Sequence, residues 1–253
     1  MSTNFPEDLN KLHEFLADLL DVQTNDEILD VGSGKGITLQ HILPKCGQGK
    51  VCGIDIEESA IEHSRSLFTN FLDTEKLELK IGDIAKGIPY QDGQFDKIIS
   101  HNVIECVEDR VGLVNEMFRV LKPGGVMILS HNDFDSQIYN TNNLSLTRTL
   151  IHLFADTKQE WMDFSDPIMG RKLFGLVSQS KFNSCEPITY TLTNTKFEKG
   201  NYGYDRAMDM VDIAKEKIPK KALDSWIDDL KLLNETREYF YSVTTFIMRA
   251  VKH

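Results

Sequence analysis

Hydrophobic residues recur with a helical period in some segments of the chain and form short uninterrupted runs in others. Leucines at three- and four-residue spacing predict an N-terminal amphipathic helix over residues 6–21. Short β-branched runs predict strands at 27–31, 51–56, 77–82, 95–100 and 126–131. Further helices are predicted at 36–43, 57–72 and 109–121. This alternation is typical of an α/β fold with a doubly wound parallel sheet.

The pattern changes after residue 131, so the second half is interpreted separately. Residues 136–180 mix aromatic and polar side chains, and we expect a helical lid insertion over the active-site edge. Two strands and one amphipathic helix are predicted at 185–192, 239–250 and 222–233. We therefore expect a single domain over 1–253. Its parts are an N-terminal helix (1–25), a ligand-binding core (26–135), the lid (136–180) and a C-terminal completion of the sheet (181–253).

A glycine-rich turn follows the first predicted strand and carries the strongest chemical signal. The strand ends in Gly32-Ser33-Gly34-Lys35-Gly36, and a helix begins at once. Glycine lets the backbone turn sharply and lets a ligand approach without meeting a Cβ atom. A tight strand-to-helix turn without a ligand would show the same pattern, so the turn needs supporting residues.

Two carboxylates supply that support. Asp55 ends the second strand about 20 residues after the glycines, where a carboxylate can accept hydrogen bonds from a ribose diol. A helix cap is the alternative role for Asp55. Asp83 follows the third strand and can accept from the amino group of adenine, although alone it would be read as a turn residue. Together these features predict a bound adenosine moiety.

The identity of the adenosine ligand depends on the residues around the turn. The dinucleotide fingerprint requires a glycine where this chain has Ile37, and no GxxxxGK[ST] phosphate loop is present. Asp30, just before the turn, would repel a pyrophosphate but suits a cationic amino-acid group. The residues therefore favour a ligand without phosphates, and an NAD-dependent oxidoreductase is the alternative enzyme.

Residues 27–131 resemble the class I S-adenosylmethionine-dependent methyltransferases, and are similar to the ubiquinone/menaquinone-biosynthesis type of small-molecule methyltransferases. The matching stretches are 28–36, 53–55, 82–83, 95–99 and the sequence Glu-Met-Phe-Arg-Val-Leu-Lys-Pro-Gly-Gly at 116–125. The resemblance implies a Rossmann-like, seven-stranded, mostly parallel sheet whose last strand is antiparallel. It also implies S-adenosyl-L-methionine as cofactor.

The resemblance assigns roles to residues along the predicted sheet edge. The methionine end of the donor would be held by Asp30, Gly32, Ser33, Gly34 and Gly36. Asp55 would bind the ribose and Ile56 would lie against the adenine. The adenine edge would meet Asp83 and Ile84, and the sulfonium would lie near His101 and Asn102.

Polar residues after the fifth strand are the candidates for the acceptor side. His131 and Asp133 are the catalytic candidates, because either can orient an acceptor or take its proton; a polar loop is the alternative. Further substrate candidates are Asp135, Tyr139, Trp161 and Arg171. Arg171 would meet either a substrate carboxylate or an acidic neighbour. Aspartates around these aromatic residues favour an amine acceptor slightly; they are Asp133, Asp135, Asp163 and Asp166.

Charge and composition narrow the class of acceptor. The 253 residues include 28 Lys+Arg and 39 Asp+Glu, a net charge of −11, which disfavours a nucleic-acid partner. The four cysteines form no CxxC pair, no metal site is expected, and no apolar run is long enough for a membrane span. With no signal peptide visible, we expect a cytoplasmic protein; the sequence predicts no oligomeric state.

The sequence thus predicts an enzyme that transfers a methyl group to N or O of a small-molecule or short-peptide acceptor. The alternatives are the NAD-dependent oxidoreductase and a catalytically inactive methyltransferase-like binding protein.

Overall fold

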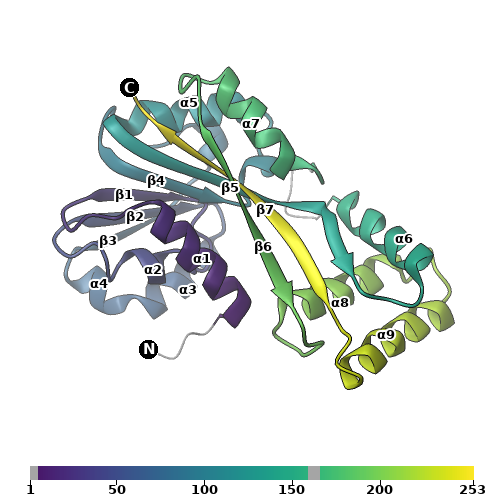
Figure 1. Cartoon of the computed structure of the whole chain (residues 1–253). Coiled ribbons are helices and arrows are strands. Elements are labelled where there is room, and N and C mark those ends of the chain that lie inside the picture. Colours follow the sequence, from purple (N-terminus) through teal and green to yellow (C-terminus); the bar gives the residue numbers. More distant parts are fainter. Residues whose placement is uncertain (1–4, 159–165) are drawn as a thin grey trace.

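The computed structural model describes residues 5–158 and 166–253 and contains one seven-stranded sheet. The strands lie in the order β3-β2-β1-β4-β5-β7-β6 (Figure 1). Their bounds are β1 Glu27–Val31, β2 Lys50–Asp55, β3 Leu77–Ile81, β4 Phe95–His101, β5 Leu121–Tyr139, β6 Glu186–Asn194 and β7 Tyr241–Val251. The pairs among β1 to β5 are parallel, and β7 is antiparallel to both β5 and β6. The predicted mostly parallel sheet with an antiparallel last strand is confirmed.

Helices cover both faces of the parallel part of the sheet, which explains why the strands there have apolar side chains on both faces. Ile28 of β1 packs into one hydrophobic cluster, while Leu29 and Val31 pack into another on the opposite face. One face is covered by α1 (Glu7–Leu19), α2 (Leu39–Ile42), α3 (Glu58–Leu67) and α4 (Thr69–Asp73). The other is covered by α5 (Arg110–Val120) and α7 (Met169–Gln179). The short turns η1 (Ile84–Lys86) and η2 (Ile104–Cys106) follow β3 and β4.

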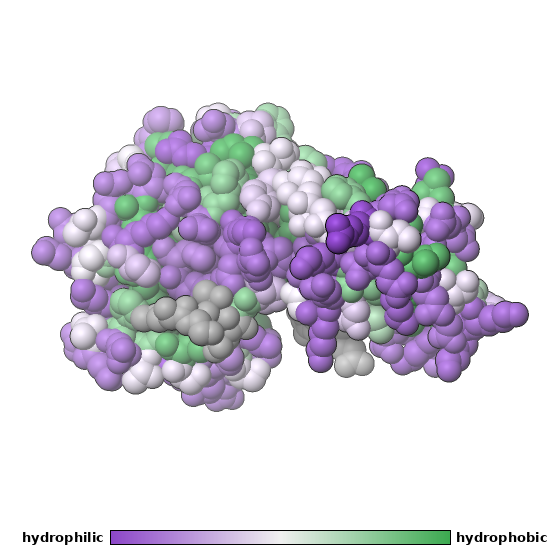
Figure 2. Space-filling model, turned by 60° about the horizontal axis from the view of Figure 1, so that its bottom comes forward, coloured by the Kyte–Doolittle hydropathy of each residue, from purple (hydrophilic) through white to green (hydrophobic). Residues whose placement is uncertain are grey.

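Three helices form a separate lobe at the far end of the long strands (Figure 1). This helical lobe consists of α6 (Leu144–Ala155), α8 (Tyr202–Ala214) and α9 (Lys220–Glu235). Its core is a third hydrophobic cluster that includes Tyr139 of β5, Trp226 of α9 and Tyr241 of β7. Figure 2 shows a mostly hydrophilic surface on this side, with a notch between the lobe and the main body. The extended ends of β5, β6 and β7 therefore carry the lobe.

The segment 136–180 differs from the single lid that its pattern suggested. The fifth strand does not end at His131 but continues to Tyr139, because β7 pairs with it on both sides of a bulge between Asp133 and Ile138. Within the segment, α6 packs with α8, whereas α7 packs on β5, β7 and α5. Leu173 and Val177 of α7 are fully buried in the main core, so this helix packs as part of the main body of the fold.

Two smaller differences concern helices. The segment 57–72 forms two consecutive helices, α3 and α4, and α8 had no strong signal in the sequence. Across 5–158 and 166–253, every helix is too short or too polar to cross a lipid bilayer.

Candidate functional site

The glycine-rich turn after β1 adopts a backbone that a side chain would disrupt. Gly32 and Gly34 have φ angles of 75° and 49°, in the left-handed region. A Cβ on Gly32 would lie 2.2 Å from Cγ2 of Val103, whereas a Cβ on Gly34 would meet nothing within 4 Å. The missing side chain of Gly32 thus permits close packing, and that of Gly34 leaves open space.

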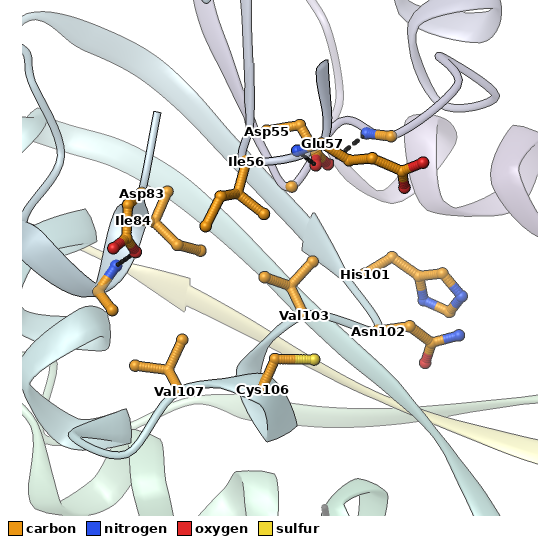
Figure 3. Close-up of a pocket in the computed structure, with 13 residues that line it drawn as sticks. Asp55, Ile56, Glu57, Asp83, Ile84, His101, Asn102, Val103, Cys106 and Val107 are labelled. Carbon is orange, nitrogen blue, oxygen red and sulfur yellow. Dashed lines mark hydrogen bonds between the residues drawn. The ribbon is translucent and has the colours of Figure 1, made fainter. Parts of the chain in front are cut away.

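That space belongs to a cavity of about 480 Å³ at the carboxyl ends of the parallel strands. It brings together eight predicted residues: Gly32, Gly34, Asp55, Ile56, Asp83, Ile84, His101 and Asn102. Five further lining residues were not predicted: Glu57, Ala85, Val103, Cys106 and Val107. Each follows a predicted residue in the same loop or short turn, and that adjacency is the signal that would have identified them. In Figure 3, Asp83 and Ile84 lie on one side of the cavity and His101 and Asn102 on the opposite side.

Asp55 connects the glycine turn to the loop after β2. Its Oδ2 accepts a hydrogen bond from the Gly34 backbone N–H at 2.8 Å, and its Oδ1 accepts from the Glu57 N–H at 2.9 Å (Figure 3). Each carboxylate oxygen has a second lone pair for a ligand hydroxyl. The side chain does not cap α3, whose N-cap is Glu57. Asp55 is therefore held in place at the cavity wall with acceptor capacity to spare.

The loop after β3 offers one polar and one apolar group. Asp83 accepts from the Ala85 N–H at 3.0 Å and forms an ion pair with Lys86, and the hydrogen bond from Lys86 lowers the pKa of Asp83. Ile56 and Ile84 both line the cavity. The Ile56 side chain is 68% exposed, which is unusual for a large apolar side chain. An apolar slot beside an ionised carboxylate suits a flat heterocycle with an exocyclic amine.

Asp30 lies beneath the turn and does not line the cavity directly. It is only 2% exposed, and its Oδ2 has no hydrogen-bond partner among the residues that the structure describes. Burial, with a smaller contribution from the nearby Asp55 charge, raises the pKa of Asp30 to about 8. The neighbouring Ser33 Oγ is also buried without a partner. These unsatisfied groups fit a ligand that brings a cationic, hydrogen-bonding amine close to the turn.

His101 and Asn102 end β4 at the opposite wall. Asn102 has a φ of 55°, and its Oδ1 accepts from the Asn132 backbone N–H at 2.8 Å, which fixes the turn out of the strand. His101 is half-buried, and its Nδ1 lies 2.9 Å from Oγ of Ser130. Both residues reach the cavity from a rigid strand end.

The two catalytic candidates lie in different surroundings from those expected. His131 is fully buried, does not line the cavity, and has Nε2 3.4 Å from Oε1 of the buried Glu105 without hydrogen-bond geometry. Asp133 is fully buried in a bidentate pair with Arg171, at 2.5 Å to Nε and 2.6 Å to Nη2. Asp133 is therefore occupied by a cation and does not face the cavity.

The remaining acceptor candidates are likewise engaged by the protein. Arg171 meets its acidic neighbours, since it also lies 3.3 Å from Asp135. Tyr139 is 4% exposed and its hydroxyl donates to the Gly203 carbonyl, so it packs in the lobe core instead of lining the cavity. Asp166 pairs with two cations, Arg110 and Lys172. Trp161 and Asp163 lie outside the described residues.

Comparisons with known proteins agree with this geometry. A family model described as "Methyltransferase domain" matches residues 23–181. A demethylmenaquinone methyltransferase from Staphylococcus epidermidis is 27% identical over 188 residues, covering 72% of this chain and 70% of the relative. A crystal structure from Bacillus halodurans shares the fold with a TM-score of 0.60 at 19% identity, covering 95% of this chain and 98% of the other.

A further relative differs in length. A 37.1 kDa protein of a Streptomyces fradiae transposon is 25% identical over 238 residues, which make up 93% of this chain but 65% of that protein. The chain thus spans less than two thirds of this relative. The residues that match the family model include the glycine-rich turn at 32–36 and all the residues that line the cavity. The chain belongs to the methyltransferase-domain family, and its sheet is that of the class I S-adenosylmethionine-dependent methyltransferases.

Proposed function

We propose that the protein methylates N or O of a small-molecule or short-peptide acceptor. The observation that carries this proposal is the charge of the cavity wall. Asp55, Glu57 and Asp83 line it, and the thirteen lining residues include neither lysine nor arginine. Asp83 is paired with Lys86, which does not itself line the cavity. A phosphate-rich acceptor would therefore meet a mainly anionic wall, whereas a neutral or cationic small molecule would not be repelled by it.

The donor supplies an electrophilic methyl group on a good leaving group, so the protein's task is to position reactants and exclude water. In this proposal Asp30 and the 32–36 turn hold the amino-acid end, and Asp55 holds the ribose. Asp83, Ile56 and Ile84 hold the adenine. His101 and Asn102 then face the region where the acceptor enters. The helical lobe stands at the same edge of the sheet (Figure 1).

The NAD-dependent alternative finds little support in this site. Ile37 occupies the position of the dinucleotide fingerprint's last glycine, so the turn lacks the small residue that this fingerprint requires there. The family match likewise favours methyl transfer.

The test is a turnover screen in which release of the demethylated donor is measured for amines, alcohols, phenols, carboxylic acids and oligonucleotides. Reactions without acceptor serve as the control for slow donor hydrolysis. We expect turnover with at least one class of small molecule and none with oligonucleotides. Preferred turnover of oligonucleotides would overturn the proposal, and donor binding without turnover on any acceptor would favour a binding protein.

A further inference from the structure

His101 presents a nitrogen without a hydrogen-bond partner at the cavity. The Ser130 hydroxyl, 2.9 Å from His101 Nδ1, donates its own hydrogen to the Ser100 carbonyl at 3.3 Å. With that hydrogen on the Ser100 carbonyl, the Ser130 oxygen accepts from a protonated Nδ1, and in this tautomer Nε2 carries the lone pair. In the part of the chain that the structure describes, Nε2 makes no hydrogen bond, and the side chain lines the cavity (Figure 3).

The groups around His101 keep it neutral. The ring of His13, from α1, meets it edge-on with centroids 5.0 Å apart, and His13 is itself held by Thr38 at 2.9 Å. Burial and the neighbouring His13 and His131 rings lower the pKa of His101 well below its usual value. Burial also lowers the pKa of His13 to about 3. Two uncharged rings packed edge-on are thus present at neutral pH.

The sequence favoured an amine acceptor because of four aspartates. Those of the four that the structure describes are all paired with cations of the protein, so none is left to bind a cationic amine. Asp133 and Asp135 pair with Arg171, and Asp166 pairs with Arg110 and Lys172. These three aspartates therefore do not favour an amine acceptor. His101 lines the cavity at the end of β4, and its Nε2 is available as a proton acceptor on that side.

We propose, building on the function proposed above, that the acceptor is a hydroxyl compound and that His101 Nε2 accepts its proton. As the new O–C bond forms, the S–C bond breaks, and its electron pair stays on sulfur. The hydroxyl proton moves to Nε2 and later leaves to solvent. An oxygen that gains a methyl group becomes strongly acidic, so a weakly basic, neutral imidazole suffices. An amine stays basic after methylation and would gain nothing from so weak a base.

The tautomer can be tested without turnover. Long-range ¹H–¹⁵N NMR of the labelled protein, with the His101 signals assigned by their loss in H101Q, should show protonated Nδ1 and bare Nε2 at neutral pH. A protonated Nε2, or an imidazolium at neutral pH, would overturn the proposal whether or not an acceptor is known.

Kinetics test the role itself. H101Q should lower kcat on a hydroxyl acceptor by about 10²–10⁴-fold, while the S-adenosylmethionine Kd, measured by calorimetry, stays within about threefold. H152Q, which changes an exposed histidine on α6, is the matched control and should keep full activity. An unchanged kcat in H101Q, or a comparable loss only in H131Q, would overturn the proposal. Turnover of amines but not hydroxyls would contradict this inference and leave the proposed function standing. Absence of turnover on every acceptor would contradict both.

Discussion

Replacing Asp30 by asparagine should make the free protein more stable at alkaline pH. The native pKa of about 8 lies above the ordinary value of 3.8, so the native state holds this proton where the unfolded chain has lost it. Asp30 therefore does not lower the free energy of unfolding below about pH 4. Its ionisation lowers that free energy progressively as the pH rises from about 4 to about 8, and the effect is constant at higher pH. In D30N this dependence is absent.

The magnitude follows from the size of the shift. At about 1.36 kcal/mol per pKa unit, the Asp30 penalty grows by up to about 4 kcal/mol between pH 5 and pH 8.5. The buried amide of D30N adds a cost of about 1–3 kcal/mol from its own unpaired groups, but that cost does not vary with pH. The stability of D30N relative to the parent protein should therefore rise with pH by an amount on the order of 3–4 kcal/mol.

The assay is urea unfolding of both proteins at several pH values, with free energies extrapolated to water. Calorimetry with S-adenosylmethionine gives the complementary result, because a cationic ligand favours ionised Asp30. Donor affinity should rise with pH in the parent protein and should be weaker and flat in D30N. A stability difference that does not change between pH 5 and pH 8.5 would show that Asp30 ionises normally, and the assignment of its buried oxygen to the donor amine would fail.

Two other variants test the site and its surroundings. G34A should weaken S-adenosylmethionine binding at least tenfold because its methyl group points into the cavity, whereas G124A, with a similar positive φ and equally open space, should only lose about 1 kcal/mol of stability; equal donor affinity in the two would refute the cavity assignment. R171M should lower the free energy of unfolding by about 3 kcal/mol, because it leaves buried Asp133 unpaired. The double variant R171M/D133N should recover part of this loss in urea unfolding, and a larger loss in the double variant would contradict the ion-pair explanation.

The gathering of the glycine turn and two aspartates around one cavity could be predicted from sequence because its determinants are local. Gly32, Gly34, Asp55 and Asp83 each stand at the end of a strand whose apolar run is plain in the sequence, and the parallel sheet then brings those ends together. The candidate acceptor-side residues after β4 instead contact partners that are distant in the sequence. Asp133 is neutralised by a cation 38 residues away, and no pattern around it reports that pairing.

The predicted element boundaries in the second half of the chain were wrong for a related reason. Residues 132–139 look like a polar loop, yet they form a strand because β7, more than 100 residues later, pairs with them across a bulge between Asp133 and Ile138. The core role of α7 was readable in principle, since Met169, Leu173 and Val177 recur every four residues on one face. Mixed aromatic and polar neighbours obscured that stripe.

The position of β7 between β5 and β6 governs the order in which the molecule can assemble. In the described structure β6 pairs with β7, which comes later in the chain than either of its neighbours. A growing chain can thus pair β1 to β5 in sequence, but β6 must wait unpaired until residues 241–251 exist. The core of the helical lobe, which contains Tyr241 and Val243 of β7, must wait with it. Pairings this distant in sequence form slowly and leave strand edges exposed meanwhile. Changes in β7 should therefore affect the yield of folded protein far more than equal changes in β1 or β2.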